Sequence, residues 1–137
     1  MLIHASCAAR DGHGVLLTGA PGSGKSDLLL RLLDYGFSLV ADDQVRLDGL
    51  QASAPEALVG LLEVRGLGIF RLPFCRAATL ALAVELDRGE RLPPQRRHDL
   101  GVPLVMIDPW TASAPNRVRL ALDCALGQVE QLAGALA

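Results

Sequence analysis

The chain has 137 residues, and half of them are hydrophobic, so we expect one domain with a sizeable core over residues 1–137 rather than two ordinary domains. Its 13 basic and 15 acidic residues give a formal net charge of −2, which argues against a nucleic-acid surface and a disordered acidic tail. Apolar runs are too short for a membrane span, no signal peptide is visible, and three isolated cysteines suggest no disulfide framework or zinc site. We therefore predict a cytoplasmic protein with no membrane or nucleic-acid partner.

The first predicted elements are a strand, a helix and a second strand. Residues 14–18 form a short apolar run that ends at a glycine, which is typical of a buried strand. Over residues 24–35 leucines recur at helical spacing, and Gly36 is well placed to end the helix. Residues 37–41 are again strand-like and are followed by two aspartates.

The middle of the chain predicts a hairpin and a segment without clear periodicity. Residues 45–47 alternate in polarity, and Asp48-Gly49 predicts a hairpin turn before a short return strand. Residues 61–72 are punctuated by glycines, so their pattern leaves the assignment open.

The last third predicts two strands, a long loop and a helix. Residues 79–86 favour a strand, although their alanine and leucine content leaves a helix open. Residues 88–103 hold three prolines and many charges, which predicts an exposed loop, and residues 104–107 resemble a last strand. Ser113 is expected to cap a C-terminal helix with a proline in its first turn. The alternation of strands and helices at the front of the chain indicates an α/β domain.

A phosphate-binding motif, G-x-x-x-x-G-K-[ST], connects the first predicted strand to the first helix. Its members are Gly19, Ala20, Pro21, Gly22, Ser23, Gly24, Lys25 and Ser26. Glycines let successive amides turn inward to form a nest for phosphate oxygens, and the helix N-terminus adds further donors. Lys25, the only lysine beside twelve arginines, would bridge the β- and γ-phosphates, and the Ser26 hydroxyl would bind magnesium. The motif predicts ATP, or a similar nucleoside triphosphate, with Mg²⁺.

Three further positions carry groups suited to phosphate chemistry. Asp42 and Asp43 end a predicted strand, where an acid can lie near phosphate and magnesium, although both can also cap the following turn. Glu63 and Arg65 would share a face if they lie on a strand, but their spacing alone favours a surface ion pair before a loose turn. His4 lies fifteen residues ahead of the motif, and by itself such a histidine is more often structural or exposed.

Together these segments resemble the catalytic domain of the HPr kinase/phosphorylase family. The resemblance depends on the glycine loop, on the segment Leu39 to Asp43, and on a stretch similar to the family's signature motif. That stretch consists of Glu63, Val64, Arg65, Gly66, Leu67, Gly68 and Ile69. The similarity covers residues 2–70 well, weakens at Glu90-Arg91-Leu92, and suggests a short form without the family's N-terminal domain.

The resemblance implies a single P-loop α/β domain of the phosphoenolpyruvate carboxykinase-like kind, with a mixed central sheet and flanking helices. It implies an ATP-dependent kinase that phosphorylates a serine of HPr, the small phosphocarrier protein of the sugar phosphotransferase system. It also implies the reverse phosphorolysis, in which inorganic phosphate takes the phosphoryl group and forms pyrophosphate. Members of the family tend to be hexamers, so a homo-oligomer is expected.

The family also implies roles for individual residues. Asp42 would take the proton of the substrate serine and return it in the reverse reaction. His4 would lie near the phosphates, and Lys25 would stabilise the transferring phosphoryl group. Ser26 and Glu63 would hold magnesium.

The remaining implied roles belong to a second acid and to arginines. Asp43 would make a further phosphate or metal contact, and Arg65 would order the signature loop. Arg91 resembles a catalytic arginine on a mobile loop, with Arg96 and Arg97 as nearby competitors.

Two other functions remain open from the sequence. A small-molecule P-loop kinase would use the arginines of residues 88–97 as a lid, but would leave the segment 63–69 unexplained. A non-catalytic ATP-sensing module would have less need of His4, Asp42 and Glu63 together.

Overall fold

The computed structural model describes residues 1–137, and it has the mixed α/β architecture expected from the sequence. The strands are β1 (Leu2–Ile3), β2 (Ser6–Arg10), β3 (His13–Thr18), β4 (Ser38–Ala41), β5 (Val45–Asp48), β6 (Gln51–Ser53), β7 (Leu61–Val64), β8 (Gly68–Arg71), β9 (Ala78–Leu86) and β10 (Leu104–Ile107). The helices are α1 (Lys25–Leu32) and α2 (Ala114–Ala125), with short 3₁₀ turns η1 (Leu33–Tyr35) and η2 (Glu56–Leu58).

One mixed sheet organises the molecule, in the order β1-β5-β6-β9-β3-β2-β4, with β10 also paired to β9. Strand β3 is parallel to β9, and β9 is parallel to β10. Strand β2 is antiparallel to both β3 and β4, so β4 runs in the same direction as β3. The carboxyl ends of β3, β4, β9 and β10 and the beginning of β2 therefore meet at one edge, where ligands of α/β sheets commonly bind.

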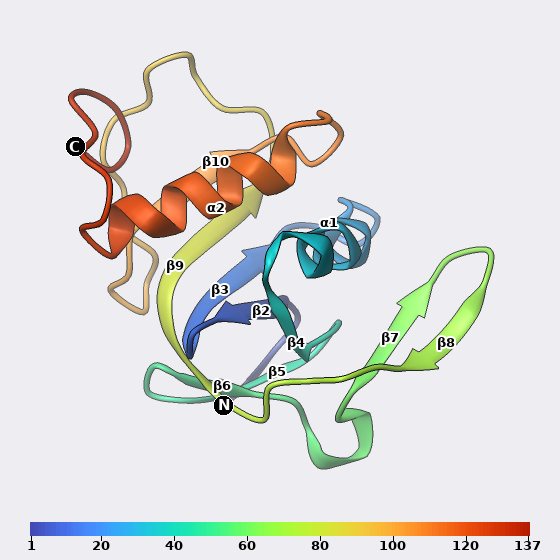
Figure 1. Cartoon of the computed structure of the whole chain (residues 1–137). Helices are drawn as coiled ribbons and strands as arrows, with labels where there is room; N and C mark the ends of the chain where they lie inside the picture. The colour runs from blue at the N-terminus through green and yellow to red at the C-terminus, as the bar shows by residue number, and fades with distance from the viewer.

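Two hydrophobic clusters cover the two faces of this sheet. Both helices pack on one face (Figure 1), while β1, β5 and β6 help to enclose the other. Along β3 the side chains alternate, with Val15 and Leu17 in the helix-side cluster and Leu16 in the opposite one. The helix-side cluster includes Leu28, Leu29, Leu32, Leu82, Val84, Val118 and Leu122.

Strand β2 is an element that the sequence pattern did not predict. Its residues are small and buried, apart from half-buried Arg10, so the strand lacks the polar–apolar alternation that marks a half-exposed strand. The turn that joins it to β3 is centred on Asp11 and Gly12, which have φ values of 51° and 79°. Two positive φ values are the requirement of a type I′ hairpin turn, and Asp-Gly is a preferred pair for it.

The predicted hairpin after residue 45 is present, but its turn lies one residue later than expected. Asp48 pairs with Gln51 inside the ladder, so the turn is centred on Gly49 and Leu50. Gly49 has φ 58°, which matches the glycine at the first central position of a type II′ turn.

The start of α2 agrees with the expected position but not with the expected capping bond. Ser113 directly precedes the helix, and a proline lies in its first turn, as predicted. The Ser113 hydroxyl makes no capping hydrogen bond; instead it accepts one from Nε of Arg117 at 2.9 Å.

Residues 88–103 contain no helix or named strand and are largely exposed, as their prolines predict.

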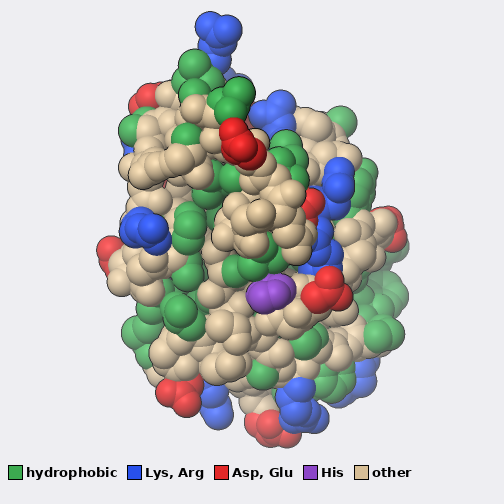
Figure 2. All heavy atoms as spheres, turned by 60° about the vertical axis from the view of Figure 1, so that its left-hand side comes forward, with side chains coloured by type: hydrophobic (Ala, Val, Ile, Leu, Met, Phe, Trp, Pro, Cys, Tyr) green, Lys and Arg blue, Asp and Glu red, His purple; other side chains and the backbone are tan.

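Acidic and basic side chains are interspersed over the face drawn in Figure 2. Neither helix is long and apolar enough to cross a bilayer.

Candidate active site

The glycine loop, residues 19–26, leaves the end of β3 and leads directly into α1, as the motif predicts. Gly24 precedes the helix with φ 101° and accepts a hydrogen bond from the Leu28 amide at 2.9 Å. Because the residue at this cap has no side chain, no side-chain oxygen occupies the first amides of α1. These donors and the positive end of the helix dipole are therefore available to an anion.

The Lys25 side chain lies across this loop. Its ammonium group donates to the carbonyls of Gly19 and Ala20 at 2.8 and 3.0 Å, and the residue is only 7% exposed. A lysine ammonium has three donors, so one remains for a phosphate oxygen. The loop therefore positions a cation beside its own amides.

The Ser23 hydroxyl is the orphaned polar group of the loop. Its oxygen is buried and has no hydrogen-bond partner within the protein. Buried hydroxyls are normally paired, so this group fits a loop that receives a polar ligand.

We predict that Gly19→Ala destabilises the chain more than Gly22→Ala. Both glycines have positive φ, but a Cβ at Gly19 would lie 2.5 Å from Oγ of Ser23, whereas a Cβ at Gly22 meets nothing within 4 Å. The Ser23 hydroxyl can rotate away, but Cβ of Ser23 would still lie 3.1 Å from the added atom, so we expect an additional loss of about 1 kcal/mol of unfolding free energy. Denaturant unfolding of the two variants measures this difference, and equal stabilities would contradict the geometry.

Asp42 is the centre of the polar network next to the loop. Its Oδ1 accepts hydrogen bonds from the hydroxyls of Ser26 at 2.7 Å and Ser6 at 3.0 Å. Its Oδ2 accepts the backbone amide of Glu63 at 3.4 Å. Asp42 as a whole residue is 8% exposed, and these three donors hold its carboxylate in a defined orientation. Three of the predicted residues, Ser26, Asp42 and Glu63, are thus brought together.

Ser6 is a member of this network that sequence reasoning missed. It is fully buried at the start of β2, and its hydroxyl oxygen also accepts the amide of Asp43 at 3.2 Å. The available signal was a single polar residue at the head of a run of small apolar residues before Asp11-Gly12. Ser6 therefore joins the two aspartates to the strand beside them.

His4 and Asp43 form an exposed pair beside this network. His4 Nδ1 lies 3.3 Å from Asp43 Oδ1, and their side chains are 49% and 64% exposed. Asp43 has φ 69°, an uncommon conformation for a residue with a side chain and one that concentrates at functional sites. The side chains of Asp42 and Asp43 therefore lie in different surroundings, Asp42 among the serines and Asp43 beside His4.

The donor set at this edge suits Mg²⁺. Magnesium prefers oxygen ligands and is usually held by one or two carboxylates together with substrate phosphates. The Ser26 hydroxyl and the Asp42 carboxylate meet at 2.7 Å beside the glycine loop. No group of three or more His, Cys, Asp or Glu residues could form a site made of protein alone. The Glu63 backbone reaches Asp42, while its side chain is exposed.

The signature segment forms a hairpin of its own, β7–β8, which extends from the body of the molecule (Figure 1). Glu63 lies on β7 opposite Ile69, but Arg65 lies in the turn between the strands. Gly66 and Gly68 both have positive φ and bend the chain there. Glu63 and Arg65 therefore do not share a strand face, and the surface ion pair that their spacing favoured is absent as well.

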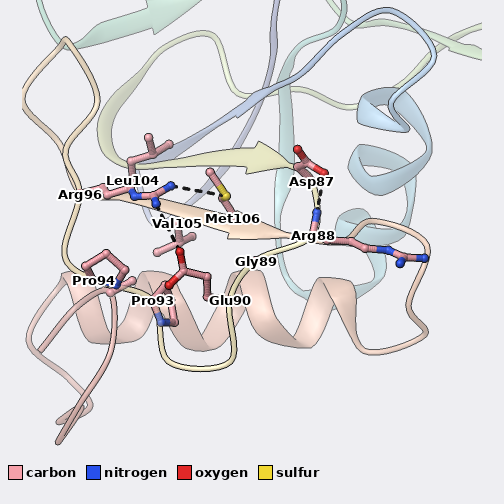
Figure 3. Close-up of a pocket in the computed structure, with 11 residues that line it drawn as sticks. Asp87, Arg88, Gly89, Glu90, Pro93, Pro94, Arg96, Leu104, Val105 and Met106 are labelled. Carbon is pink, nitrogen blue, oxygen red and sulfur yellow. Dashed lines mark hydrogen bonds and ion pairs between the residues drawn. The ribbon is translucent and has the colours of Figure 1, made fainter.

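The predicted arginines of the long loop lie away from this network. Arg91 lines a cavity of about 300 Å³ together with α2 and residues near the C-terminus. Arg96 is 3.8 Å from Glu90 and contacts the sulfur of Met106, as Figure 3 shows, and Arg97 bonds the Gly101 carbonyl at 2.7 Å. None of these three arginines has a hydrogen bond or ion pair with the glycine loop in this structure.

Arg88 has a different orientation from its neighbours in the same loop. Figure 3 shows its side chain pointing away from Glu90 and Arg96. Its Nε lies 3.9 Å from Oδ2 of Asp108, which follows β10. Arg88 is thus an arginine near the sheet edge that the sequence reasoning did not single out.

Cys7 offers no nucleophile to this site. Burial, with a smaller contribution from nearby Cys75, raises the pKa of the Cys7 thiol to about 12. The thiol is therefore protonated at neutral pH and packs as a small apolar side chain in β2.

Comparison with known proteins gives consistent matches. The family model described as the HPr serine kinase C-terminal domain matches residues 1–75. HPr kinase/phosphorylases of Xanthomonas campestris pv. campestris (strain B100) and Xylella fastidiosa (strain M12) are each 53% identical over 64 residues. These alignments cover 43% of this chain but only 20% of each relative.

A solved structure extends the similarity beyond the matched segment. The Hpr(Ser) kinase/phosphatase from Coxiella burnetii has a TM-score of 0.74 and 26% sequence identity. The superposition covers 93% of this chain and 92% of that one, so the mixed sheet and both helices belong to the shared fold.

Proposed function

The chain belongs to the family of HPr serine kinase C-terminal domains, and from this premise we propose that it transfers phosphate from ATP to a serine of an HPr-type phosphocarrier protein. We include the reverse reaction, in which inorganic phosphate accepts the phosphoryl group from phosphoserine and pyrophosphate forms. The observation that carries the proposal is the network in which Asp42 meets Ser26 beside the glycine loop. In that network a carboxylate lies next to the loop that we propose binds phosphate.

The cradle would hold the triphosphate through backbone amides and Lys25. In phosphoryl transfer the protein contributes chiefly positioning and neutralisation of charge. The free donor of the Lys25 ammonium supplies positive charge at the phosphate tail. Ser26 and Glu63 would hold Mg²⁺, which would supply the remaining neutralisation of charge.

The proton of the substrate serine would be accepted by Asp42. Two serine hydroxyls and one amide orient this carboxylate, and a positioned base typically contributes about 10²–10⁴-fold to a rate. In the reverse direction the same group returns the proton. His4 and Asp43 would form the exposed border of the site, with Asp43 as a further phosphate or metal contact.

We also propose a cytoplasmic homo-oligomer that acts in regulation of the phosphotransferase system. Apolar side chains at the end of the β7–β8 hairpin support subunit contact, since Leu67 and Ile69 are 76% and 69% exposed.

The catalytic arginine remains a prediction for Arg91, which would have to approach the glycine loop from its present cavity.

The test is phosphorylation of purified HPr by the protein with magnesium and ATP. We expect phosphoserine on HPr, and pyrophosphate after inorganic phosphate is added to the product. HPr with its target serine replaced by alanine is the control and should remain unmodified. Transfer to a small metabolite instead of HPr would identify a small-molecule kinase, and ATP binding without any transfer would identify a sensor.

A further inference from the structure

An exposed tryptophan lies at the rim of the glycine loop. Trp110 follows β10 in the connection to α2, is the only tryptophan in the chain, and is 68% exposed. A Cβ built at Gly24 would lie 3.2 Å from Cη2 and 3.3 Å from Cζ2 of the indole. The edge of the ring therefore packs against the last glycine before α1, while much of its surface faces solvent.

Hydrogen bonds hold the loop that carries this indole in a fixed position. The Trp110 amide donates to Oδ1 of Asp108 at 3.0 Å, and the Thr111 hydroxyl donates to the Asp108 carbonyl at 3.0 Å. Arg31 of α1 donates to the carbonyls of Thr111, at 3.3 Å, and of Pro109. The indole and the phosphate-binding helix are therefore parts of one rigid assembly. An anchored aromatic loses little further conformational entropy when a ligand covers it.

The indole lies where the base of a nucleotide bound at the glycine loop could cover its exposed face. A nucleotide whose phosphates bind the amides of residues 19–26 continues as ribose and base beyond the edge of the loop. Flat aromatic rings stack favourably on nucleobases, and such stacking does not require a particular base. We propose that Trp110 stacks on the base of the nucleotide whose phosphates occupy the glycine loop, and so determines how much a base adds to the affinity. This inference depends on the proposed nucleotide-binding function.

The experiment compares ATP with inorganic tripolyphosphate, which has the phosphate chain without ribose or base. Binding of each, with Mg²⁺, is measured by calorimetry for the wild type, Trp110→Ala and Trp110→Phe. We expect Trp110→Ala to weaken ATP binding by roughly 5- to 150-fold and to leave tripolyphosphate binding unchanged. Trp110→Phe retains an aromatic face and should bind ATP within a few-fold of the wild type.

Fluorescence gives a second readout, because every indole signal comes from Trp110. ATP should change the emission of the wild type, whereas tripolyphosphate should change it much less. Tyr35→Ala is the matched control, since Tyr35 is an exposed aromatic beyond the opposite end of α1. It should leave both affinities unchanged.

Three results would overturn the inference. Equal ATP affinity of the wild type and Trp110→Ala would show that the base does not stack on the indole. A parallel loss of tripolyphosphate binding would show that the ring only supports the loop. Loss of HPr binding or of self-association in Trp110→Ala, with ATP binding intact, would assign the ring to a protein contact. Failure of the wild type to bind either probe would instead reject the proposed function, and this inference with it.

Discussion

Asp42→Asn is expected to lower the rate of phosphoryl transfer to HPr by about 10²–10⁴-fold while ATP affinity changes little. An amide has nearly the shape of a carboxylate but cannot take a proton from a serine hydroxyl. Its oxygen can accept the Glu63 amide, and its NH₂ group can donate to the rotatable hydroxyls of Ser6 and Ser26. The variant should therefore fold. Single-turnover transfer and ATP calorimetry measure the two quantities separately.

Asp43→Asn is the matched control for this prediction. It changes the neighbouring carboxylate, which is exposed and paired with His4 rather than held by the serines. We expect Asp43→Asn to retain more than a tenth of the wild-type rate. The opposite ranking of the two variants would assign the proton acceptor to the His4–Asp43 pair and would reject the proposed role of Asp42.

Leu17→Ala is expected to lower the free energy of unfolding by about 2–5 kcal/mol. Leu17 is fully buried on β3, in the cluster between the sheet and the two helices. Its backbone is paired on both sides, with Ser6 of β2 and Val84 of β9, so the surroundings cannot easily collapse into the space left behind. Because domains are commonly stable by only about 5–15 kcal/mol, this loss is a large fraction of the total.

Leu132→Ala removes the same atoms from the surface and serves as the control. Leu132 is 87% exposed, so its replacement should change the unfolding free energy by no more than about 0.5 kcal/mol. Chemical denaturation of both variants gives the comparison. Similar losses for the two would mean that the assigned core around β3 is incorrect.

The elements that could be predicted are those marked by a motif or an apolar pattern within one short stretch of sequence. The glycine loop is one continuous motif, and β3, α1 and β4 around it have clear apolar patterns, so the loop and the two aspartates could be placed at strand ends. The sequence left open whether Asp42 lies near the loop or only caps the turn, and the contact with Ser26 is seen in the structure. Strand β2 could not be found in this way, because its small, buried residues lack alternation. Ser6 was missed for the same reason.

Other features depend on tertiary contacts that spacing does not encode. Trp110 is an unremarkable surface aromatic until the end of β10 is seen beside Gly24. The loop of residues 88–103 has no periodicity, so no pattern could indicate that Arg91 faces α2 while Arg88 approaches Asp108. Residues 61–72 lack a clear period, so their spacing could not show that β7 ends at Val64 and that Arg65 lies in the turn.

The arrangement of the first residues of the chain has a practical consequence for work with the purified protein. His4 lies between β1 and β2, Ser6 begins β2, and the terminal amine of Met1 donates to the Leu47 carbonyl at 3.0 Å. An affinity tag fused ahead of Met1 would disturb that anchor and place extra chain within a few residues of His4. The C-terminus lies in a different part of the molecule (Figure 1), so a tag attached there stays away from His4 and Ser6.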